Sequence, residues 1–586
     1  MSIHWLWLAW LYPLMGGLWL VRLGPAALTG PWPGLLLRTA SLPALIAVAT
    51  VPTDVPLDVP WLLLGARFEL GALTRIFLLF TALLWGVAGW YGARYVAHDE
   101  RRHRFALCWL LSLSGNLGLI VAGDIPGFYT FFALMTFAAY GLVVHSRSDT
   151  AIRAGRVYIA MAILGEVMIL SGLLLIALTG ESLLIRDAVA GVSGSGWDHA
   201  IIPLILFGFG VKTGLLPLHG WLALAHPVAP TPASAVLSGS MIKAGLLGWI
   251  SFLPGGYASY AGWGSLIIAL GCLGAFYAVA VGLTQQNPKT NLAYSSISQM
   301  GVMTICIGIG LSEVADWSTA VLIVAIYALN HAFAKGALFL GVGVVLAEPR
   351  TPRIHRYIIF AGLGLAALAI AGSPMTGGAL AKRALKYLAA SEHLLWAETL
   401  NVLLPLSALA TTLLLSRLLY LLYRKMTAAD RQPDGHEGLM FSWSVNLLAV
   451  AVMAWLTIYS LQLPISTSPF TPADLLKAAL PILGGLFLAY GAWHFMRPLQ
   501  RVPPAGDIVV AFERVAQWIA GAWVRIVAHP LEQWDVSADP FVRRLLPTDR
   551  GRDRVLDAET RIRRFEVSGA VFVFLMVMLL FALWMG

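Results

Sequence analysis

Charged residues are scarce in this chain. Of its 586 residues, only 12% are Asp, Glu, Lys or Arg, and 59% are hydrophobic. A soluble domain carries about 25% charged residues. This scarcity excludes an ordinary soluble protein and predicts an all-α protein that crosses a bilayer many times.

Cysteine is also scarce, with one residue each at Cys108, Cys272 and Cys306. Each stands alone in an apolar run, so no C-x-x-C pair supports an iron–sulfur or zinc site, and we expect small buried side chains instead. The chain also lacks a Gly-rich nucleotide loop and a flavin fingerprint. We therefore expect no cofactor and no redox or hydrolytic site in this chain.

Long apolar runs are abundant. A membrane span needs about 20 apolar residues, and about sixteen runs of that kind fall near residues 4–21, 33–51, 70–97, 105–122, 125–144, 155–179, 200–224, 232–252, 260–283, 295–312, 317–347, 357–390, 396–423, 440–462, 472–495 and 566–585. Pro217 interrupts the seventh run and GSPMTGG (372–378) interrupts the twelfth. The first run lacks a basic start and an A-x-A site, so we expect no cleaved signal peptide.

The connecting loops predict the orientation. Loops 98–104, 145–156, 348–356 and 424–432 each hold three Lys or Arg residues, and the intervening loops hold one or none. The positive-inside rule then places these four loops in the cytoplasm and both termini outside. The net charge of +9 mostly reflects this asymmetry, so it indicates no nucleic-acid partner.

One long polar stretch, residues 498–565, interrupts the apolar pattern on the predicted cytoplasmic side. Within it, residues 507–529 have the spacing of an amphipathic helix that contains Trp and Arg. Such a helix suits a position along the membrane surface or across neighbouring helices. A helical linker without a partner is the alternative.

Six ionisable residues lie inside apolar runs. A charge at the bilayer centre costs about 3 kcal/mol on insertion scales, so each is a functional candidate. The six are Glu166, Lys212, Lys243, His331, Lys335 and Lys382, and accessory candidates are His219, His226, Ser238 and Asn330. An apolar environment disfavours an ammonium and a nearby carboxylate favours it, so a lysine with a movable glutamate can act as a two-state proton site.

The candidates also have structural explanations. Lys382 could snorkel to the interface, Lys243 could be a structural counter-charge, and His331 could be a hydrogen-bonded core histidine. His219 and His226 could form hydrogen bonds with the backbone groups that the helix break leaves unpaired, or could face the outer aqueous side. Two observations favour function: His331 and Lys335 share one helix face, and Lys212 and Lys382 each accompany a break, as in transporters built from inverted repeats.

The pattern K-x-x-x-x-P-L-H-x-W-L-x-x-A-H-x-x-A-P-T-P-x-S-A-x-L-S-G-x-x-x-K-x-G at residues 212–245 closely resembles the signature of the antiporter-like proton-conducting membrane subunits. These occur in respiratory complex I, membrane-bound hydrogenases, formate hydrogenlyases and multisubunit cation/proton antiporters. LAYSSISQMG (292–301), NHAFAKGALFLGVG (330–343) and GSPMTGGALAK (372–382) support the resemblance, which covers about residues 70–420.

The resemblance implies two inverted five-helix repeats with discontinuous helices 7 and 12. Here they would be residues 105–252 and 260–424, after N-terminal helices in 1–104. The last part, 440–586, would hold helices 14–16 and the amphipathic segment 498–565, as in the long distal member of the family. In that member a lateral helix runs along the neighbouring subunits, and the corresponding segment of this chain looks short.

The resemblance also implies roles. Lys212 is similar to the central lysine of helix 7, Lys243 to the helix 8 lysine, His331 and Lys335 to the helix 11 pair, and Lys382 to the terminal relay residue. The chain would then move protons, or exchange cations for protons, in the inner membrane of a prokaryote. Its partners would be other membrane subunits, including a homologous antiporter-like subunit or an energising subunit.

Three positions depart from the family pattern. Ala133 replaces the usual helix 5 glutamate, so we infer that Glu166, on helix 6, pairs with Lys212 instead; the alternative is a half-channel without this switch. Ser238 replaces a histidine, and Leu73-Thr74-Arg75 replaces the L-D-G motif. These changes argue against a standard quinone-reducing subunit and favour a divergent hydrogenase-like, antiporter-like or carbon-uptake assembly.

Two other functions stay open from the sequence. The first is a stand-alone cation/proton antiporter, which would need a carboxylate-lined site. The second is a membrane partner of a CO2-hydrating subunit with little conduction of its own. The sequence names neither the complex, nor the driving reaction, nor the coupling ion.

Overall fold

The computed structural model divides the chain into two units, Met1–Val509 and Val510–Gly586. The residues it describes are 2–24, 30–347, 353–391, 394–427, 438–460, 471–495, 503–506 and 510. The predicted amphipathic segment lies outside the described residues except at 503–506 and 510, and the last apolar run, 566–585, lies wholly outside them.

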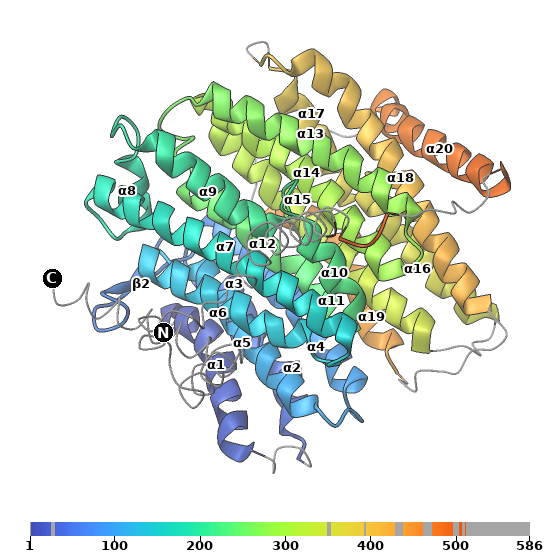
Figure 1. Ribbon diagram of the computed structural model, residues 1–586, viewed down its shortest axis with the longest axis horizontal. Helices are drawn as coiled ribbons and strands as arrows, with labels where there is room; N and C mark the ends of the chain where they lie inside the picture. The colour runs from blue at the N-terminus through green and yellow to red at the C-terminus, as the bar shows by residue number, and fades with distance from the viewer. Residues whose placement is uncertain are drawn as a thin grey trace, which may run out of the picture. The chain divides into compact units, whose positions relative to one another are not determined.

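Helices dominate the described part of the chain (Figure 1). Thirteen of the described helices are long and apolar enough to cross a membrane. The first half contains η1 (Ser2–His4), α1 (Trp5–Leu23), α2 (Trp32–Thr39), α3 (Leu42–Thr50), α4 (Ala72–Tyr95), α5 (Arg102–Val121), α6 (Ile125–Val143), α7 (Asp149–Gly180), α8 (Ile185–Ala190), α9 (Asp198–Thr213), α10 (Gly220–Val228), α11 (Thr231–Val236), η3 (Leu237–Met241) and α12 (Lys243–Phe252). The second half contains α13 (Ala261–Thr284), α14 (Pro288–Ser312), α15 (Val314–Ala347), α16 (Arg353–Ala371), α17 (Gly377–Ala389), α18 (Ala397–Thr427), α19 (Met440–Ser460) and α20 (Pro472–Phe495).

The seventh and twelfth apolar runs are each broken into two helices. The first break separates α9 from α10 and contains Pro217, and the second separates α16 from α17. Gly214 and Gly372 follow α9 and α16 with φ values of 74° and 87°. Glycine adopts this left-handed conformation without steric penalty, which lets the helices stop there. The first break leaves Lys212 in the last turn of α9.

Burial is greatest in the middle of the first unit. In the apolar 18-residue stretches of α14 and α15, 100% and 89% of the residues are buried, whereas in those of α7 and α20 the shares are 33% and 11%. Helix α14 packs along α13 and α15. Helices α7 and α20 therefore offer apolar faces to lipid or to other subunits, and the polar residues of α14 and α15 must find partners inside the protein.

A π-helical turn, η3, lies between α11 and α12. The wider turn inserts one residue relative to an α-helix, and such turns are frequent at functional sites. Lys243 begins α12 two residues after η3 ends.

Arg75 has a structural role that explains its departure from the L-D-G pattern. Its guanidinium donates hydrogen bonds to the carbonyl oxygens of Val48 at 2.5 Å and Val51 at 2.7 Å. These carbonyls lie at the C-terminal end of α3. Because the last carbonyls of a helix lack partners within it, a cation there is favourable, whereas the glycine of the L-D-G pattern has no side chain to donate these bonds.

A short hairpin was not predicted from the sequence. Strands β1 (Leu57–Val59) and β2 (Ala66–Phe68) pair antiparallel, and Phe68 and Asp124 form bridges to Ala122 and Leu184. The hairpin therefore joins the loop before α4 to the end of α5, and the bridge at Asp124 joins the start of α6 to the segment after α7. Strands this short have no alternating run long enough to stand out from their sequence.

Asp124 fixes this junction, and its removal should destabilise the protein. Its carboxylate is 1% exposed and accepts hydrogen bonds from the backbone N–H groups of Arg67 and Gly127, both at 2.7 Å. Asp124→Ala leaves both donors unsatisfied and removes the N-cap of α6, so we expect a loss of about 1–3 kcal/mol. The measurement is thermal unfolding of the detergent-solubilised full chain.

Asp58 provides the matched control. It forms an exposed ion pair with the Arg67 side chain at 2.7 Å, and this hydrogen bond holds the pKa of Asp58 below its ordinary value. Surface ion pairs contribute about 0–1 kcal/mol, so Asp58→Ala should change the unfolding temperature little. Equal losses in the two variants would contradict the role given to Asp124.

Candidate functional site

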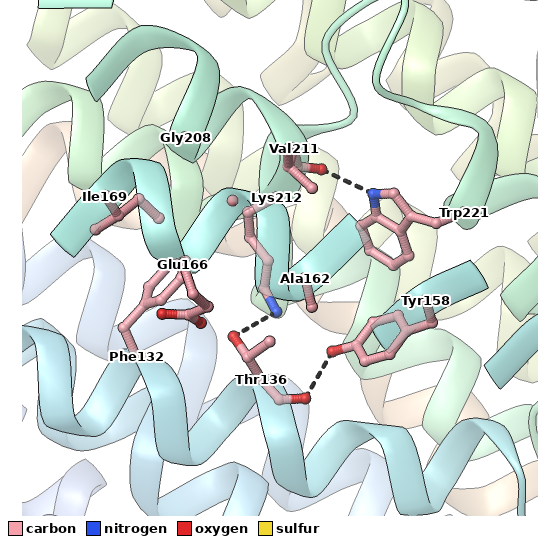
Figure 2. A pocket seen from close by; sticks show the side chains of 11 residues that line it. Phe132, Thr136, Tyr158, Ala162, Glu166, Ile169, Gly208, Val211, Lys212 and Trp221 are labelled. Carbon is pink, nitrogen blue, oxygen red and sulfur yellow. Dashed lines mark hydrogen bonds between the residues drawn. The ribbon is translucent and has the colours of Figure 1, made fainter. Parts of the chain in front are cut away.

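A small cavity surrounds the Lys212 side chain between α6, α7, α9 and α10. Its volume is about 20 Å³. Figure 2 shows Lys212, Glu166 and Thr136 reaching this space from α9, α7 and α6. Lys212 is 5% exposed and Glu166 is 2% exposed. The structure thus brings together a buried base and a buried acid that are far apart in the sequence.

The ammonium of Lys212 contacts a hydroxyl and two aromatic rings. Its Nζ donates a hydrogen bond to Thr136 Oγ1 at 3.1 Å and lies 5.6 Å and 5.8 Å from the ring centres of Phe132 and Tyr158. The Tyr158 hydroxyl donates to the Thr136 carbonyl oxygen at 2.8 Å, which fixes that ring (Figure 2). Aromatic faces attract a cation, so the two rings offset part of the cost of burying the ammonium.

Glu166 faces the same cavity without touching Lys212. Both carboxylate oxygens are buried and have no hydrogen-bond partner among the described residues. A cavity needs roughly 10–15 Å³ to hold one water molecule, so the measured volume suits a single water beside these groups. An ammonium and a carboxylate placed in this way can exchange a proton through one intervening water.

The sequence anticipated Glu166 in this position but missed its neighbours. Ala133, where the family has glutamate, lies on α6 less than one turn before Thr136. The structure thus places Glu166 from α7 in the cavity beside Lys212. A lone Thr or Tyr in an apolar helix carries no signal by itself. The spacing along α7 does carry a signal, because Tyr158 precedes Glu166 by eight residues, which is about two helical turns.

A second cluster surrounds Lys243. Its Nζ donates to the Ser238 carbonyl oxygen at 2.6 Å and lies 2.7 Å from His331 Nδ1. Ser238 Oγ shares a hydrogen bond of 2.7 Å with Ser296 Oγ. Lys243, Ser238 and His331 are all 0% exposed. Residues from η3, α12, α14 and α15 therefore meet around one buried nitrogen pair.

Lys335 lies one helical turn beyond His331 on α15. Its Nζ donates to the Leu292 carbonyl oxygen at 2.9 Å and to the Ser295 hydroxyl. His331 Nε2 is buried without a hydrogen-bond partner in the described part of the chain. Lys335 and Lys243 also have no ion-pair partner there, so neutral oxygens and an imidazole solvate these two lysines.

Close packing connects the helices of the two clusters. A Cβ at Gly245 would lie 2.8 Å from the Phe209 carbonyl oxygen and 2.6 Å from the Thr213 side chain. Only glycine allows α12 to approach α9 this closely. The contact between Gly245 and Thr213 therefore links the two clusters. Gly245 lies two residues after Lys243, and Thr213 directly follows Lys212.

The accessory candidates are dispersed around these clusters. His226 is buried at the end of α10 and stacks on Phe339 with ring centres 4.6 Å apart. His219 packs edge-on against Tyr277 at 5.7 Å. Asn330 Nδ2 donates to the carbonyl oxygen of Ala369, in α16, at 3.2 Å. None of these three contacts joins the accessory residue directly to a predicted lysine.

Lys382 lies in a separate and larger cavity. This cavity, between α17, α18 and α20, has a volume of about 150 Å³. Lys382 is half-buried, and its Nζ donates to the Ala371 carbonyl oxygen at 2.7 Å. Because Ala371 ends α16, the ammonium caps that helix, which differs from the snorkelling geometry considered from the sequence.

Residues 122–406 match the family described as NADH:quinone oxidoreductase/Mrp antiporter, TM. This central region of the chain belongs to that family. All six buried ionisable candidates lie within the matched residues. The match confirms the resemblance drawn from residues 212–245, and the chain is a multi-pass membrane protein.

Two curated proteins are similar to this chain. Hydrogenase-4 component B of Escherichia coli (strain K12) is 29% identical over 293 residues, which cover 48% of this chain and 44% of that protein. Na(+)/H(+) antiporter subunit A1 of Staphylococcus haemolyticus (strain JCSC1435) is 28% identical over 426 residues, which cover 67% of this chain and 52% of that protein. The chain therefore spans about half the length of the curated relatives it matches.

A solved structure shares the fold. A chain in the structure of the Mrp complex from Dietzia sp. superposes with a TM-score of 0.68 at 20% identity, over 90% of this chain and 60% of that one. At this identity the likeness shows the antiporter-family membrane fold alone.

Proposed function

We propose that this chain is a proton-translocating subunit of a larger membrane complex. The observation that carries the proposal is the buried contact of 2.7 Å between Lys243 Nζ and His331 Nδ1. Two proton-binding groups at hydrogen-bond distance can pass a proton between them. Lys212 and Glu166 would feed this pair from one side, and Lys335 and Lys382 would follow it.

The first step concerns Lys212 and Glu166. Protonated Glu166 would release its proton through the single water to the neutral amine of Lys212, giving a carboxylate and an ammonium that stabilise each other. Thr136 Oγ1 and the two aromatic rings hold the ammonium in place. Loss of the Lys212 proton to the next group would leave the Glu166 carboxylate beside a neutral amine, and uptake of a new proton by Glu166 would then return the pair to its starting state.

The second step passes through His331. When Lys243 donates its hydrogen bond, His331 Nδ1 is the acceptor and the ring proton is on Nε2. Proton transfer from Nζ to Nδ1 then gives an imidazolium, which can release the other proton from Nε2. Lys335, one helical turn further on α15, is the natural next acceptor. Each transfer breaks one N–H bond and forms another.

The charges favour protons over a metal cation. Ammonium groups at Lys212, Lys243 and Lys335 would repel Na⁺ in a medium of low dielectric, whereas a proton travels as part of these groups. Like-charge repulsion also couples the stations, because a proton at one lysine disfavours a proton at the next. A partner subunit would drive the cycle by changing one of these charges.

We further propose the family architecture for this chain. The matching breaks between α9 and α10 and between α16 and α17 support two inverted five-helix repeats at 105–252 and 260–424. This architecture includes sixteen membrane helices in total and places both termini outside. Relatives named as a hydrogenase component and an antiporter subunit support partners that include an energising or a homologous membrane subunit.

The test is ion movement by the assembled complex. The complex would be purified through a tag on this chain and reconstituted in vesicles that contain a pH-sensitive dye. We expect proton movement coupled to the driving reaction and collapsed by a protonophore. His331→Gln keeps a polar side chain of similar reach but cannot carry a proton, so we expect about a tenfold loss of coupled translocation.

His199 is the matched control, because it is exposed at the start of α9. His199→Gln should leave translocation unchanged. Equal rates in the two variants would remove His331 from the path. Sodium flux through the isolated chain would favour the stand-alone antiporter instead. Recovery of a zinc-containing partner from a complex without ion flux would favour the carbon-uptake alternative.

A further inference from the structure

The cavity around Lys382 contains more positive charge than proton transfer requires. Besides Lys382, its lining includes Arg383 and Lys386 from α17 and Lys477 and Asp474 from α20. Four cations therefore face one carboxylate. The remaining lining is mostly apolar. An excess of three positive charges in an apolar setting calls for an anion.

The Asp474 carboxylate already has partners within the protein. Its Oδ2 lies 3.5 Å from Arg383 Nη2 and accepts hydrogen bonds from the Thr471 hydroxyl at 2.9 Å and the Thr471 N–H at 3.2 Å. These contacts cap the start of α20. The carboxylate therefore contacts Arg383 and its own helix, and although it also attracts Lys477 electrostatically, a single negative charge cannot balance the four cations.

The ammonium groups of Lys386 and Lys477 form no direct contact with an acceptor in the described part of the chain, and Lys477 interacts with Asp474 only through its charge. Both are exposed, and neither forms a hydrogen bond or an ion pair within the described part of the chain. Lys382 and Lys386 are four residues apart, so they lie on one face of α17. Lys382 uses one of its three ammonium hydrogens for the Ala371 carbonyl. Several donors are thus available around one space.

The space has the size for a compact anion. At about 150 Å³ it offers roughly ten times the volume that one water molecule requires on the same measure. Three lysines at the wall and rim can surround the oxygens of a phosphate group. Carboxylates are smaller and would leave part of the space and one of the cations unused.

The surface beside the cavity is apolar and exposed. Leu476, Leu480 and Leu483 of α20 are 58%, 56% and 58% exposed, and Phe487 is 76% exposed. Tyr387, next to Lys386, is 85% exposed, and tyrosine is enriched at the level of lipid head groups. A ligand with a phosphate head and apolar tails would satisfy both the cavity and this surface.

We propose that the cavity between α17, α18 and α20 binds a phosphate group, with an anionic phospholipid as its source. Lysine ammonium groups bind phosphate oxygens through charge-assisted hydrogen bonds. Lys386 and Lys477 contact the phosphate at the rim, and Lys382 lies beneath it. The bound lipid fills the groove between α17 and α20.

The experiment is a calorimetric titration of the full chain in non-ionic detergent with dioctanoyl phosphatidylglycerol, dioctanoyl phosphatidylcholine and inorganic phosphate. We expect phosphatidylglycerol to bind at least tenfold more tightly than the other two. Lys386→Gln together with Lys477→Gln should weaken its binding about ten- to thirtyfold. Both side chains are exposed, so the double variant should fold.

The control is Arg424→Gln together with Lys425→Gln, an equally exposed basic pair at the other end of α18. It should bind phosphatidylglycerol as the unaltered chain does. Equal binding by the two double variants, or equal binding of the two lipids, would overturn the proposal. Inorganic phosphate bound as tightly as phosphatidylglycerol, and lost in the same variant, would overturn the lipid as its source.

Discussion

Replacing Lys212 with alanine is expected to reduce coupled proton translocation at least about a hundredfold, because the proposed proton carrier of the first half is lost. The complex should still assemble, since the Lys212 side chain is only 5% exposed and lies inside this chain. The measurement is dye-reported proton movement in vesicles that contain the whole complex, normalised to the amount of this chain incorporated.

Alanine also leaves Glu166 alone in an apolar cavity, which could destabilise the chain by itself. Lys212→Arg separates the two effects, because arginine keeps a cation but does not release its proton. We expect Lys212→Arg to fold and still fail to translocate. Lys425, exposed at the end of α18, gives the control: Lys425→Ala should translocate normally. Unchanged pumping by both Lys212 variants would refute the assignment.

Changing Glu166 to glutamine is expected to lower translocation by about tenfold or more while the protein remains folded. Glutamine has nearly the same shape as glutamate, and both Glu166 oxygens already lack hydrogen-bond partners among the described residues, so packing should be preserved. What disappears is the negative charge that stabilises the Lys212 ammonium across the cavity. The same vesicle assay measures the effect.

Glu166→Asp and Glu181→Gln complete this test. Aspartate keeps the charge but withdraws it by about one methylene, so it should retain part of the activity. Glu181, exposed at the end of the same helix, should tolerate glutamine without loss. If Glu166→Gln pumps as well as the unaltered chain, Lys212 functions without a carboxylate, and the substitution at Ala133 removed the switch of this half.

The sequence predicted the membrane helices well because the bilayer imposes a local rule. Each apolar run up to residue 495 coincides with one or two helices of the structure. The breaks at Pro217 and in residues 372–378 were also visible, because proline and glycine end helices through their own backbone preferences. The run 33–51 still differed, since α2 and α3 are separated by a turn at Ala40 and Ser41.

The lateral contacts were much less visible. Thr136 and Lys212 are 76 residues apart, and nothing in the local pattern of α6 marks a threonine as the partner of that lysine. The contact between Lys243 and His331 spans 88 residues. The sequence supplied these candidates because isolated charges are rare in membrane helices. Their pairing follows from the packing of α6, α9, α12 and α15, which no local rule encodes.

The small volume beside Lys212 has a consequence for leakage. A space of about 20 Å³ holds roughly one water molecule, so no continuous column of water forms there. A hydrated sodium or potassium ion is too large for this space, and in the proposed mechanism protons advance only when a side chain changes its charge. The subunit would thus act as an electrical insulator between turnovers, which lets the cell keep its membrane voltage while this protein is idle.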